Sequence, residues 1–286
     1  MGGHYMVEHE KNDISNVKEF WTKNPMTFIK HKGKSAKQIF DETIVDSRQR
    51  RWYHAEGKPL YYQFINYPSL VGKKVLEVGY GLGAMANELI NAGAIYTGID
   101  LSSYHYEFCS ELFRGYKSAT FLEGNAENLP FDNNCFDFAL SHGVMHHSPD
   151  TQRCIDETHR VLKDGSTFYC MLYRKSFLRY WYMKVFKFGI LRGELFKYKS
   201  IHEVVERHTD THGGSIGAPI SRYYKNKEIR ELFKQFSSCK YEILGNYSEL
   251  GGFPLTRLNV RQILPLSKQH EILRRHGGFF FINAIK

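Results

Sequence analysis

The stretch VLEVGYGLGAMANELINAGAIYTGID, residues 75–100, carries the pattern that decides the fold. A strand-like apolar run leads into glycines at positions 79, 81 and 83, and a helix-like run follows them. A second strand-like run then ends at Asp100. Glycines let a chain turn sharply and let a ligand approach the backbone, and the N–H groups that begin the next helix are free to bind it. The stretch therefore predicts a strand–turn–helix–strand unit that binds a nucleotide-like ligand.

The alternation of strands and helices continues along the chain. We expect helices within 84–93, 102–116, 151–165 and 225–236, with Ser102 or Ser103 as an N-cap and Gly165 closing the third helix. Strands are expected within 73–78, 95–100, 119–125, 136–143, 166–173, 241–247 and 277–286. This alternation predicts an α/β fold with a Rossmann-like, mostly parallel sheet of seven strands, helices on both faces and an antiparallel last strand.

Four segments follow from these patterns. Residues 1–71 are expected to form a helical N-terminal lid that includes a helix stopped before Pro25, and residues 72–173 form the ligand-binding core. Residues 174–224 break the rhythm and are interpreted as a cap inserted over the sheet. Residues 225–286 complete the sheet, and the linker 248–276 is long enough to carry a helix of its own.

Composition limits the classes of function. The net charge of +9 is uneven, because residues 72–165 carry −6 and residues 166–286 carry +12. No zinc-finger, RNA-recognition or helix-turn-helix pattern accompanies the basic part, so we expect a solvated basic face and no nucleic-acid partner. No apolar run reaches about 18 residues, and the polar first residues lack the apolar core of a signal peptide. Five scattered cysteines favour reduced thiols and a cytoplasmic setting.

The glycine turn alone fits two ligands. GYGLGA satisfies the dinucleotide fingerprint, and Asp100 is placed to bind a ribose diol in either case. Glu77, just before the first glycine, can accept from the ammonium of an amino-acid-bearing ligand but would repel a pyrophosphate. Asn125 and the Ala126 N–H, in EGNAENLPF, are placed to pair with an adenine edge. SHGVMHHSPD brings further polar groups to the rim where such sheets bind ligands.

The series VLEVGYGLG, GID, GNAENLPFDNNCFDFALSHGVMHHSPD and RVLKDGSTFYCMLY resembles the class I S-adenosylmethionine (SAM)-dependent methyltransferases, in the branch that acts on small molecules. The resemblance covers residues 72–173 strongly and the C-terminal strands weakly. It implies SAM as the cofactor, lying across the carboxyl ends of the strands. The residues that it implies for the methionine part, the ribose and the adenine are Glu77, Gly79, Gly81, Gly83, Asp100, Leu101, Asn125 and Ala126, with Ser141 or His142 lining the methionyl side.

This sequence departs from the family pattern at two positions. Asn125 stands where an aspartate is common, although its carbonyl can still accept from adenine. Tyr80 replaces a small residue between the first two glycines, and it either narrows the methionine pocket or faces the helix.

The implied reaction is transfer of the SAM methyl group to an O, N or C nucleophile of a small molecule, with release of S-adenosylhomocysteine. Alternatives are a SAM-consuming reaction without methyl transfer, a non-catalytic SAM-binding subunit and, from the dinucleotide fingerprint, an NAD-dependent oxidoreductase. His146 or His147 is the candidate base, since histidine titrates near neutral pH; the alternative is that both only satisfy backbone groups. The histidine spacings lack acidic or cysteine partners, so we expect no metal.

The cap and lid carry the remaining candidates. Trp181, Tyr182, Phe186 and Phe188 are expected either to close over an apolar acceptor or to seal the cap against the sheet. A basic aromatic helix can also lie on a membrane surface, which is the less favoured interpretation. Arg48 and residues 51–53 (Arg51, Trp52, Tyr53) are expected to fold over the SAM pocket. The oligomeric state does not follow from the sequence.

Overall fold

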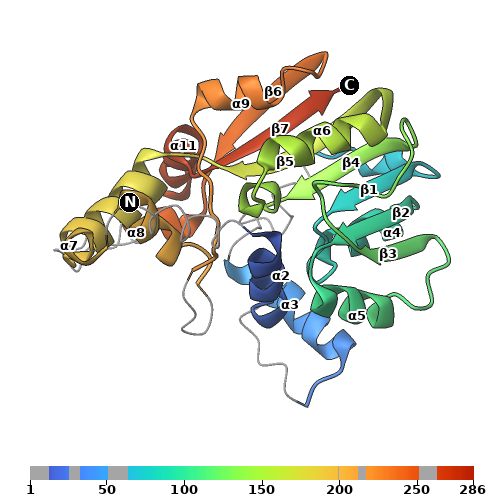
Figure 1. Cartoon of the computed structure of the whole chain (residues 1–286), viewed down its shortest axis with the longest axis horizontal. Helices are drawn as coiled ribbons and strands as arrows, with labels where there is room; N and C mark the ends of the chain where they lie inside the picture. Colours follow the sequence, from blue (N-terminus) through green and yellow to red (C-terminus); the bar gives the residue numbers. More distant parts are fainter. Residues whose placement is uncertain (1–12, 26–32, 51–63, 199, 212–216, 251–262) are drawn as a thin grey trace, which may run out of the picture.

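A single seven-stranded sheet forms the centre of the molecule (Figure 1). The computed structural model describes residues 13–25, 33–198, 200–250 and 263–286, apart from 51–63 and 212–216 and apart from the side chains of 45–50 and 247–248. The strand order is β3-β2-β1-β4-β5-β7-β6. The strands are β1 (Lys74–Val78), β2 (Ile95–Asp100), β3 (Ala119–Glu123), β4 (Phe136–His142), β5 (Leu162–Tyr173), β6 (Ser238–Leu244) and β7 (Phe279–Ile285).

The strand directions confirm the predicted Rossmann-like class. β1 pairs in parallel with β2 and β4, β2 with β3, and β4 with β5. β7 runs antiparallel to both of its neighbours, β5 and β6. In such a sheet the loops that follow the parallel strands meet at one edge, where ligands bind.

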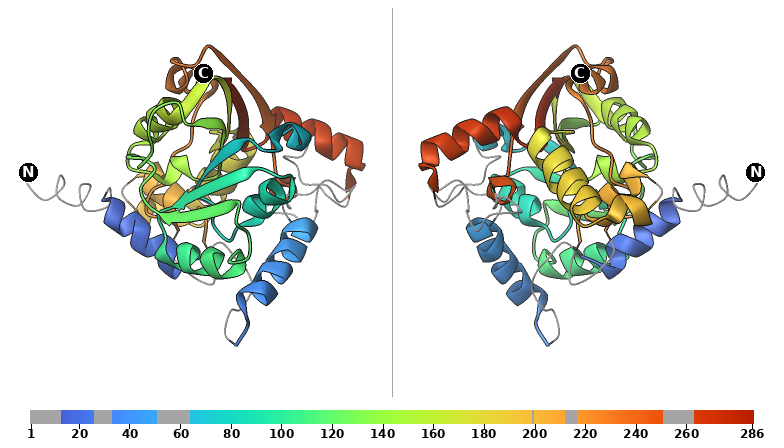
Figure 2. Two further views of the ribbon diagram at one scale, coloured as in Figure 1. Left: turned by 90° about the vertical axis from the view of Figure 1, so that its right-hand side faces the viewer. Right: turned by 90° about the vertical axis from the view of Figure 1, so that its left-hand side faces the viewer.

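Helices cover both faces of the sheet (Figure 2). One apolar cluster joins the sheet to α3 (Ala36–Arg50), α4 (Ala84–Asn91) and α5 (Ser103–Leu112). The other joins it to α6 (Thr151–Val161) and α9 (Asn226–Leu232). The remaining helices are α2 (Ile14–Lys23), η4 (Phe177–Ile190), α7 (Glu194–Lys197), α8 (Ile201–Arg207), α11 (Leu266–His276) and the short turns η2 (Tyr67–Leu70), η3 (Met145–His147) and η5 (Tyr247–Leu250).

Local sequence explains several helix starts. Ser102 caps α5 by accepting from the His105 N–H, as one of the two predicted caps. Asp150 caps α6 in the same way through the Arg153 N–H. The helix expected before Pro25 is α2, and the linker 248–276 does carry a helix, α11.

The expected helical span 151–165 is wrong at its end. α6 stops at Val161 and β5 begins at Leu162. Leu162 pairs with Phe136, yet Thr167 pairs with Phe138, so the strand bulges between these pairs. Gly165, with φ +75°, turns the chain inside this bulge rather than ending a helix. Pairing with β4 therefore overrides the helical periodicity. Similarly, β6 starts three residues before its predicted position, at Ser238.

The inserted segment packs beside the sheet rather than within it. It leaves β5 after Tyr173 and forms η4, a helix with i→i−5 hydrogen bonds such as Leu191 N–H to the Phe186 carbonyl. α7 and α8 pack against η4, and the three form a lobe at the left of the sheet in Figure 1. Within the described residues, no helix has the length and apolar character needed to cross a membrane.

Candidate active site

A cavity of about 280 Å³ lies at the carboxyl ends of β1 to β5. Its walls come mainly from the loops after these strands, from the N-terminal helices α2 and α3, and from Asp210 of the cap. Nine of the twelve candidate cofactor-binding and catalytic residues line it, as does Tyr80; the nine are Glu77, Gly79, Gly81, Asp100, Leu101, Asn125, Ala126, His142 and His147. The other three candidates do not line the cavity. Gly83 is the N-cap of α4, Ser141 is fully buried in β4, and His146 is fully buried in the turn η3.

The glycine loop requires glycine for two different reasons. Gly79 has φ +81°, and a Cβ there would lie 2.3 Å from the Val144 side chain. Gly81 has φ +52°, but a Cβ there would meet nothing within 4 Å. Since Gly81 lines the cavity, its backbone faces open space that a ligand can enter. The loop thus forms a bare backbone cradle.

Glu77 is a buried acid at the wall of this cradle, with 2% of its surface exposed. The Tyr96 hydroxyl donates to Glu77 Oε2 at 2.7 Å. Burial raises the pKa of Glu77 to about 8, and the Tyr96 hydrogen bond only partly opposes this. A buried carboxyl with a raised pKa is a fitting partner for a ligand ammonium, which would stabilise its charged form.

Asp100 ties the second strand to the glycine loop. Its carboxylate accepts from the Gly81 and Ser102 N–H groups, both at 2.9 Å, and lies 3.1 Å from His105 Nδ1. Burial would raise the pKa of Asp100, but His105 and these N–H donors outweigh it and hold the pKa below its usual value. The carboxylate is therefore ionised and able to accept from hydroxyl groups.

Tyr80, the departure from the family pattern, points toward β3. Its hydroxyl donates to the Leu122 carbonyl at 3.1 Å, and its ring meets Phe121 edge-on at 5.1 Å. A Cβ at Gly98 would lie 2.7 Å from the Tyr80 ring and 2.5 Å from the Tyr96 hydroxyl. Gly98 therefore makes room for both tyrosines, one of which holds Glu77.

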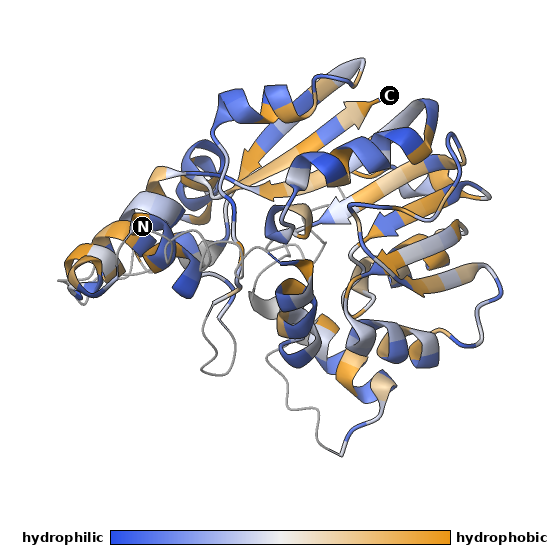
Figure 3. Cartoon of the chain, viewed as in Figure 1, coloured by the Kyte–Doolittle hydropathy of each residue, from blue (hydrophilic) through white to orange (hydrophobic). Residues whose placement is uncertain are grey.

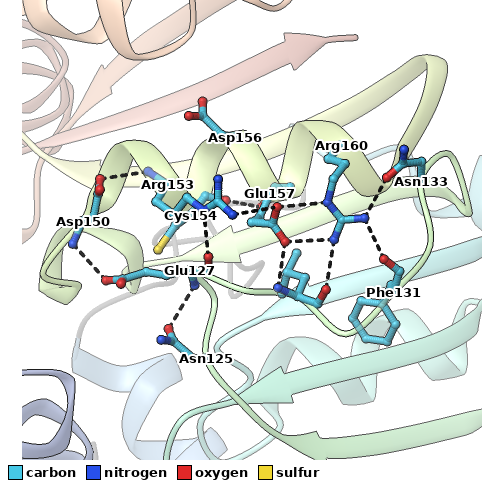
Figure 4. A network of polar contacts seen from close by, with 12 residues as sticks. Asn125, Glu127, Phe131, Asn133, Asp150, Arg153, Cys154, Asp156, Glu157 and Arg160 are labelled. Carbon is cyan, nitrogen blue, oxygen red and sulfur yellow. Dashed lines mark hydrogen bonds and ion pairs between the residues drawn. The ribbon is translucent and has the colours of Figure 1, made fainter.

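A polar network fixes the loop that follows β3 (Figure 4). The Asn125 Oδ1 accepts from the Glu127 N–H at 2.9 Å. Glu127 in turn accepts from the Ser148 hydroxyl and the Asp150 N–H, and Arg153 donates to the Glu127 carbonyl. Because a carbonyl oxygen has two lone pairs, Asn125 can still accept from a ligand.

The histidines predicted as bases occupy different environments. The His147 Nδ1–H donates to the Ile220 carbonyl at 2.6 Å, while Nε2 lies 3.2 Å from Asp210 Oδ2. Both partners are hydrogen-bond acceptors, so together they fix the orientation of the His147 ring. His146 is fully buried against the Tyr173 ring at 3.7 Å, and neither ring nitrogen has a hydrogen-bond partner among the described residues. Burial holds the pKa of His146 well below its usual value, so it is neutral.

Asp210 and Tyr173 are cavity residues that the sequence did not point to. The Tyr173 hydroxyl donates to Asp210 at 2.9 Å, so Asp210 joins the end of β5 to His147. Burial would raise the pKa of Asp210, but His147, Arg179 and Lys184 hold it well below its usual value. Asp210 has a φ of +53°, which is rare outside glycine. The sequence does not reveal this backbone conformation.

Burial also lowers the pKa of His142 to about 4, so this ring is neutral at physiological pH.

The lid differs in part from expectation. α2 supplies Ile14, Val17 and Trp21 to the cavity, and the Trp21 ring meets His147 edge-on at 5.0 Å. The predicted lid residues Arg51, Trp52 and Tyr53 lie outside the described residues, as does the side chain of Arg48.

The four cap aromatics, expected either to close over the acceptor or to seal the cap against the sheet, do not line the cavity. Trp181 and Phe186 are 43% and 38% exposed, Tyr182 stacks on Phe186, and Phe188 stacks on His208 at 3.7 Å. Instead, the cap contributes Asp210.

Comparison with known proteins agrees with this geometry. A family model described as a methyltransferase domain matches residues 76–170, from β1 to β5. Residues 76–170 are a methyltransferase domain. This domain resembles the phthiotriol/phenolphthiotriol dimycocerosates methyltransferase of Mycobacterium tuberculosis, with 38% identity over 111 residues, 38% of this chain and 41% of that protein. It also resembles the fatty-acid O-methyltransferase of Mycolicibacterium smegmatis, with 35% identity over 38% of this chain and 40% of that protein.

These matches span about two fifths of the length of the curated relatives. Two solved structures share the fold of the methyltransferase domain over more of the chain. A SAM-dependent methyltransferase from Methanosarcina mazei has a TM-score of 0.50 and 20% identity, covering 80% of this chain and 97% of its own. The Haemonchus contortus phosphoethanolamine N-methyltransferase 2 has a TM-score of 0.53 and 17% identity, covering 94% of this chain and 60% of its own.

Proposed function

We propose that this protein is a SAM-dependent methyltransferase whose acceptor is a lipid-like molecule with an oxygen nucleophile. The observation that carries the proposal is one cavity in which two groups of residues meet. Toward β3 and β2 stand Asn125, Asp100 and the glycine loop; toward β5 stand His147, Asp210 and Tyr173. The first group suits a nucleoside with an amino-acid tail, and the second suits a polar acceptor atom.

The residues of the first group fit SAM. The bare backbone at Gly81 offers a cradle, and Glu77, whose pKa burial raises to about 8, offers a partner for the ammonium. Asp100 would accept from the ribose hydroxyls and Asn125 from the adenine. When bound, SAM supplies a methyl group on a sulfonium, so the protein has to align the two reactants and exclude water.

The second group would position the acceptor oxygen. Asp210 carries a buried negative charge between the His147 imidazole and the Tyr173 hydroxyl. A hydroxyl acceptor would donate to this carboxylate, whereas a carboxylate acceptor would accept from Tyr173 or His147. Because the pKa of Asp210 is held low, it is a weak base but a strong orienting group. His146 has no such role in this proposal, since it does not line the cavity.

The choice of a lipid-like acceptor rests on two observations. Apolar and aromatic side chains contribute much of the cavity lining, including Trp21, Val17, Met145 and Met171. The two named relatives act on a dimycocerosate and on a fatty acid. The second of these names specifies methylation of an oxygen atom.

The test is a reaction with SAM and a long-chain fatty acid or long-chain alcohol in mild detergent. S-adenosylhomocysteine formed with one of these acceptors, and not with a short-chain analogue or a polar amine, is the expected result. Methylthioadenosine formed without acceptor would refute methyl transfer and favour a non-methylating reaction of SAM. Turnover of the amine alone would refute the oxygen nucleophile.

A further inference from the structure

The cap carries a concentration of exposed apolar side chains. Seven of the fourteen large hydrophobic residues that are exposed in the described part of the chain lie within residues 177–201. Phe196 is 94% exposed and Phe177 66%. We call the set the cap face; its members are Phe177, Trp181, Phe186, Ile190, Leu191, Phe196 and Ile201. Exposed patches of this kind mark surfaces that contact another apolar phase.

Four members of the cap face form a stripe along η4. Phe177, Trp181, Phe186 and Ile190 follow one another at spacings of four, five and four residues. A helix with i→i−5 hydrogen bonds brings residues at these spacings to one side. Tyr180, Lys184, Val185 and Gly189 occupy the buried side. Figure 3 shows the mixture of apolar and polar segments along this lobe, which lies beside the sheet at the left of the view.

Positive charges accompany the cap face. The segment 174–199 contains eight basic residues and one acid, Glu194, which pairs with His208 at 2.6 Å. Lys175 Nζ lies 4.6 Å from the centre of the Tyr180 ring, and Arg192 lies 4.8 Å from that of Phe188. Arg192 and Lys197 are themselves exposed. The charged ends of these side chains lie over aromatic rings, so the cap carries apolar and positively charged groups side by side.

We propose that the cap face docks on the surface of a bilayer that contains anionic phospholipid. Apolar side chains would enter the headgroup boundary, and the basic groups would meet the anionic headgroups. Charge complementarity selects this occupant over a neutral apolar surface. The cap that carries the face also supplies Asp210 to the cavity, so docking would bring the cavity next to lipid-soluble acceptors. This last step rests on the proposed function, whereas the docking itself does not.

The experiment is flotation of the full chain with vesicles of phosphatidylcholine alone or mixed with phosphatidylglycerol. Binding is expected on the mixed vesicles, with a loss as the salt concentration rises. Phe177→Ser with Phe196→Ser should weaken binding at least tenfold. Val71→Ser with Ile263→Ser, at 66% and 59% exposed positions outside the cap, is the matched control and should bind as the wild type does.

A second variant pair tests the charges separately. Arg192→Gln with Lys197→Gln should lower the partition onto mixed vesicles by about thirtyfold, because each basic residue near an anionic surface contributes about 1 kcal/mol. Equal flotation with neutral and mixed vesicles, or unchanged flotation of both cap variants, would overturn the proposal. The proposal would also fail if the wild type did not float and formed a dimer that the Phe177→Ser, Phe196→Ser variant converts to a monomer. That result would show that the cap face binds a second copy of the chain.

SAM affinity, measured by calorimetry on the same variants, separates this inference from the proposed function. The cap variants should bind SAM as the wild type does, because the cap face does not line the cavity. A chain that methylates detergent-dispersed acceptor but does not float would lose the docking inference and keep the function. A chain that floats but gives no turnover would keep the docking inference and lose the proposed function.

Discussion

Binding of the SAM-like ligand should release a proton from Glu77. Burial raises the pKa of this carboxyl to about 8 in the ligand-free chain. At pH 7 about nine tenths of the molecules therefore carry a proton on Glu77. An ammonium placed against the carboxyl favours its charged form, which lowers the pKa and expels that proton. The ligand's own ammonium is already protonated at pH 7, so the net release is about 0.9 proton.

Titration calorimetry measures this release directly. S-adenosylhomocysteine is titrated at pH 7 in buffers of different ionisation enthalpy, and the slope of the observed enthalpy gives the number of protons released. Glu77→Gln, which keeps the size of the side chain and removes its titration, should release none. Release close to zero in the wild type, or equal release in both proteins, would refute the assignment of Glu77 to the ammonium.

The same pKa has a consequence for stability. Between pH about 4.5 and 8, the folded ligand-free chain holds a proton on Glu77 that the unfolded chain releases. The folded state then binds more protons, so the contribution of this group to stability falls as the pH rises through that window. Conversely, ligand affinity should rise by up to about tenfold per pH unit between pH 5 and 7, because each binding event expels one proton.

Three further predictions concern the loop and the acceptor side. Gly79→Ala should cost about 2–5 kcal/mol in thermal or denaturant unfolding, from a left-handed φ and the contact with Val144; adding Val144→Ala should recover only part, and full recovery would contradict the strain. His147→Phe should lower kcat at least a hundredfold, while His146→Phe, which keeps the ring against Tyr173, should stay within about threefold; equal losses would contradict the assignment. Asp210→Asn should lower kcat at least tenfold in the methyl-transfer assay with SAM affinity within twofold, and a matching loss of affinity would place Asp210 in SAM binding instead.

Much of the fold could be read from residues that are close in sequence. The strands β1, β2 and β4 are short apolar runs, and the glycines between β1 and α4 mark a turn that local sterics require. The end of α6 could not be read in this way. Residues 162–164 continue the helical pattern, and only pairing with β4, far away in sequence, makes them strand.

The site was readable to the same extent. Glu77 and Asp100 lie at the carboxyl ends of β1 and β2, and Asn125 follows β3, so their positions in the sequence predict their proximity. Asp210 lies 37 residues from Tyr173 and reaches it only because the cap folds back over β5. The turn η3 and the Ile220 carbonyl likewise decide that His147, and not His146, faces the cavity. Neither feature can be predicted from the spacing of nearby residues.

A crystal structure of the chain grown with S-adenosylhomocysteine would test directly whether this cavity binds SAM. We expect ligand density along the carboxyl ends of β3, β2 and β1, with the ammonium beside Glu77, the ribose at Asp100 and the adenine at Asn125. Density elsewhere, or an adenine placed toward Tyr173 with the amino-acid tail away from Glu77, would contradict it.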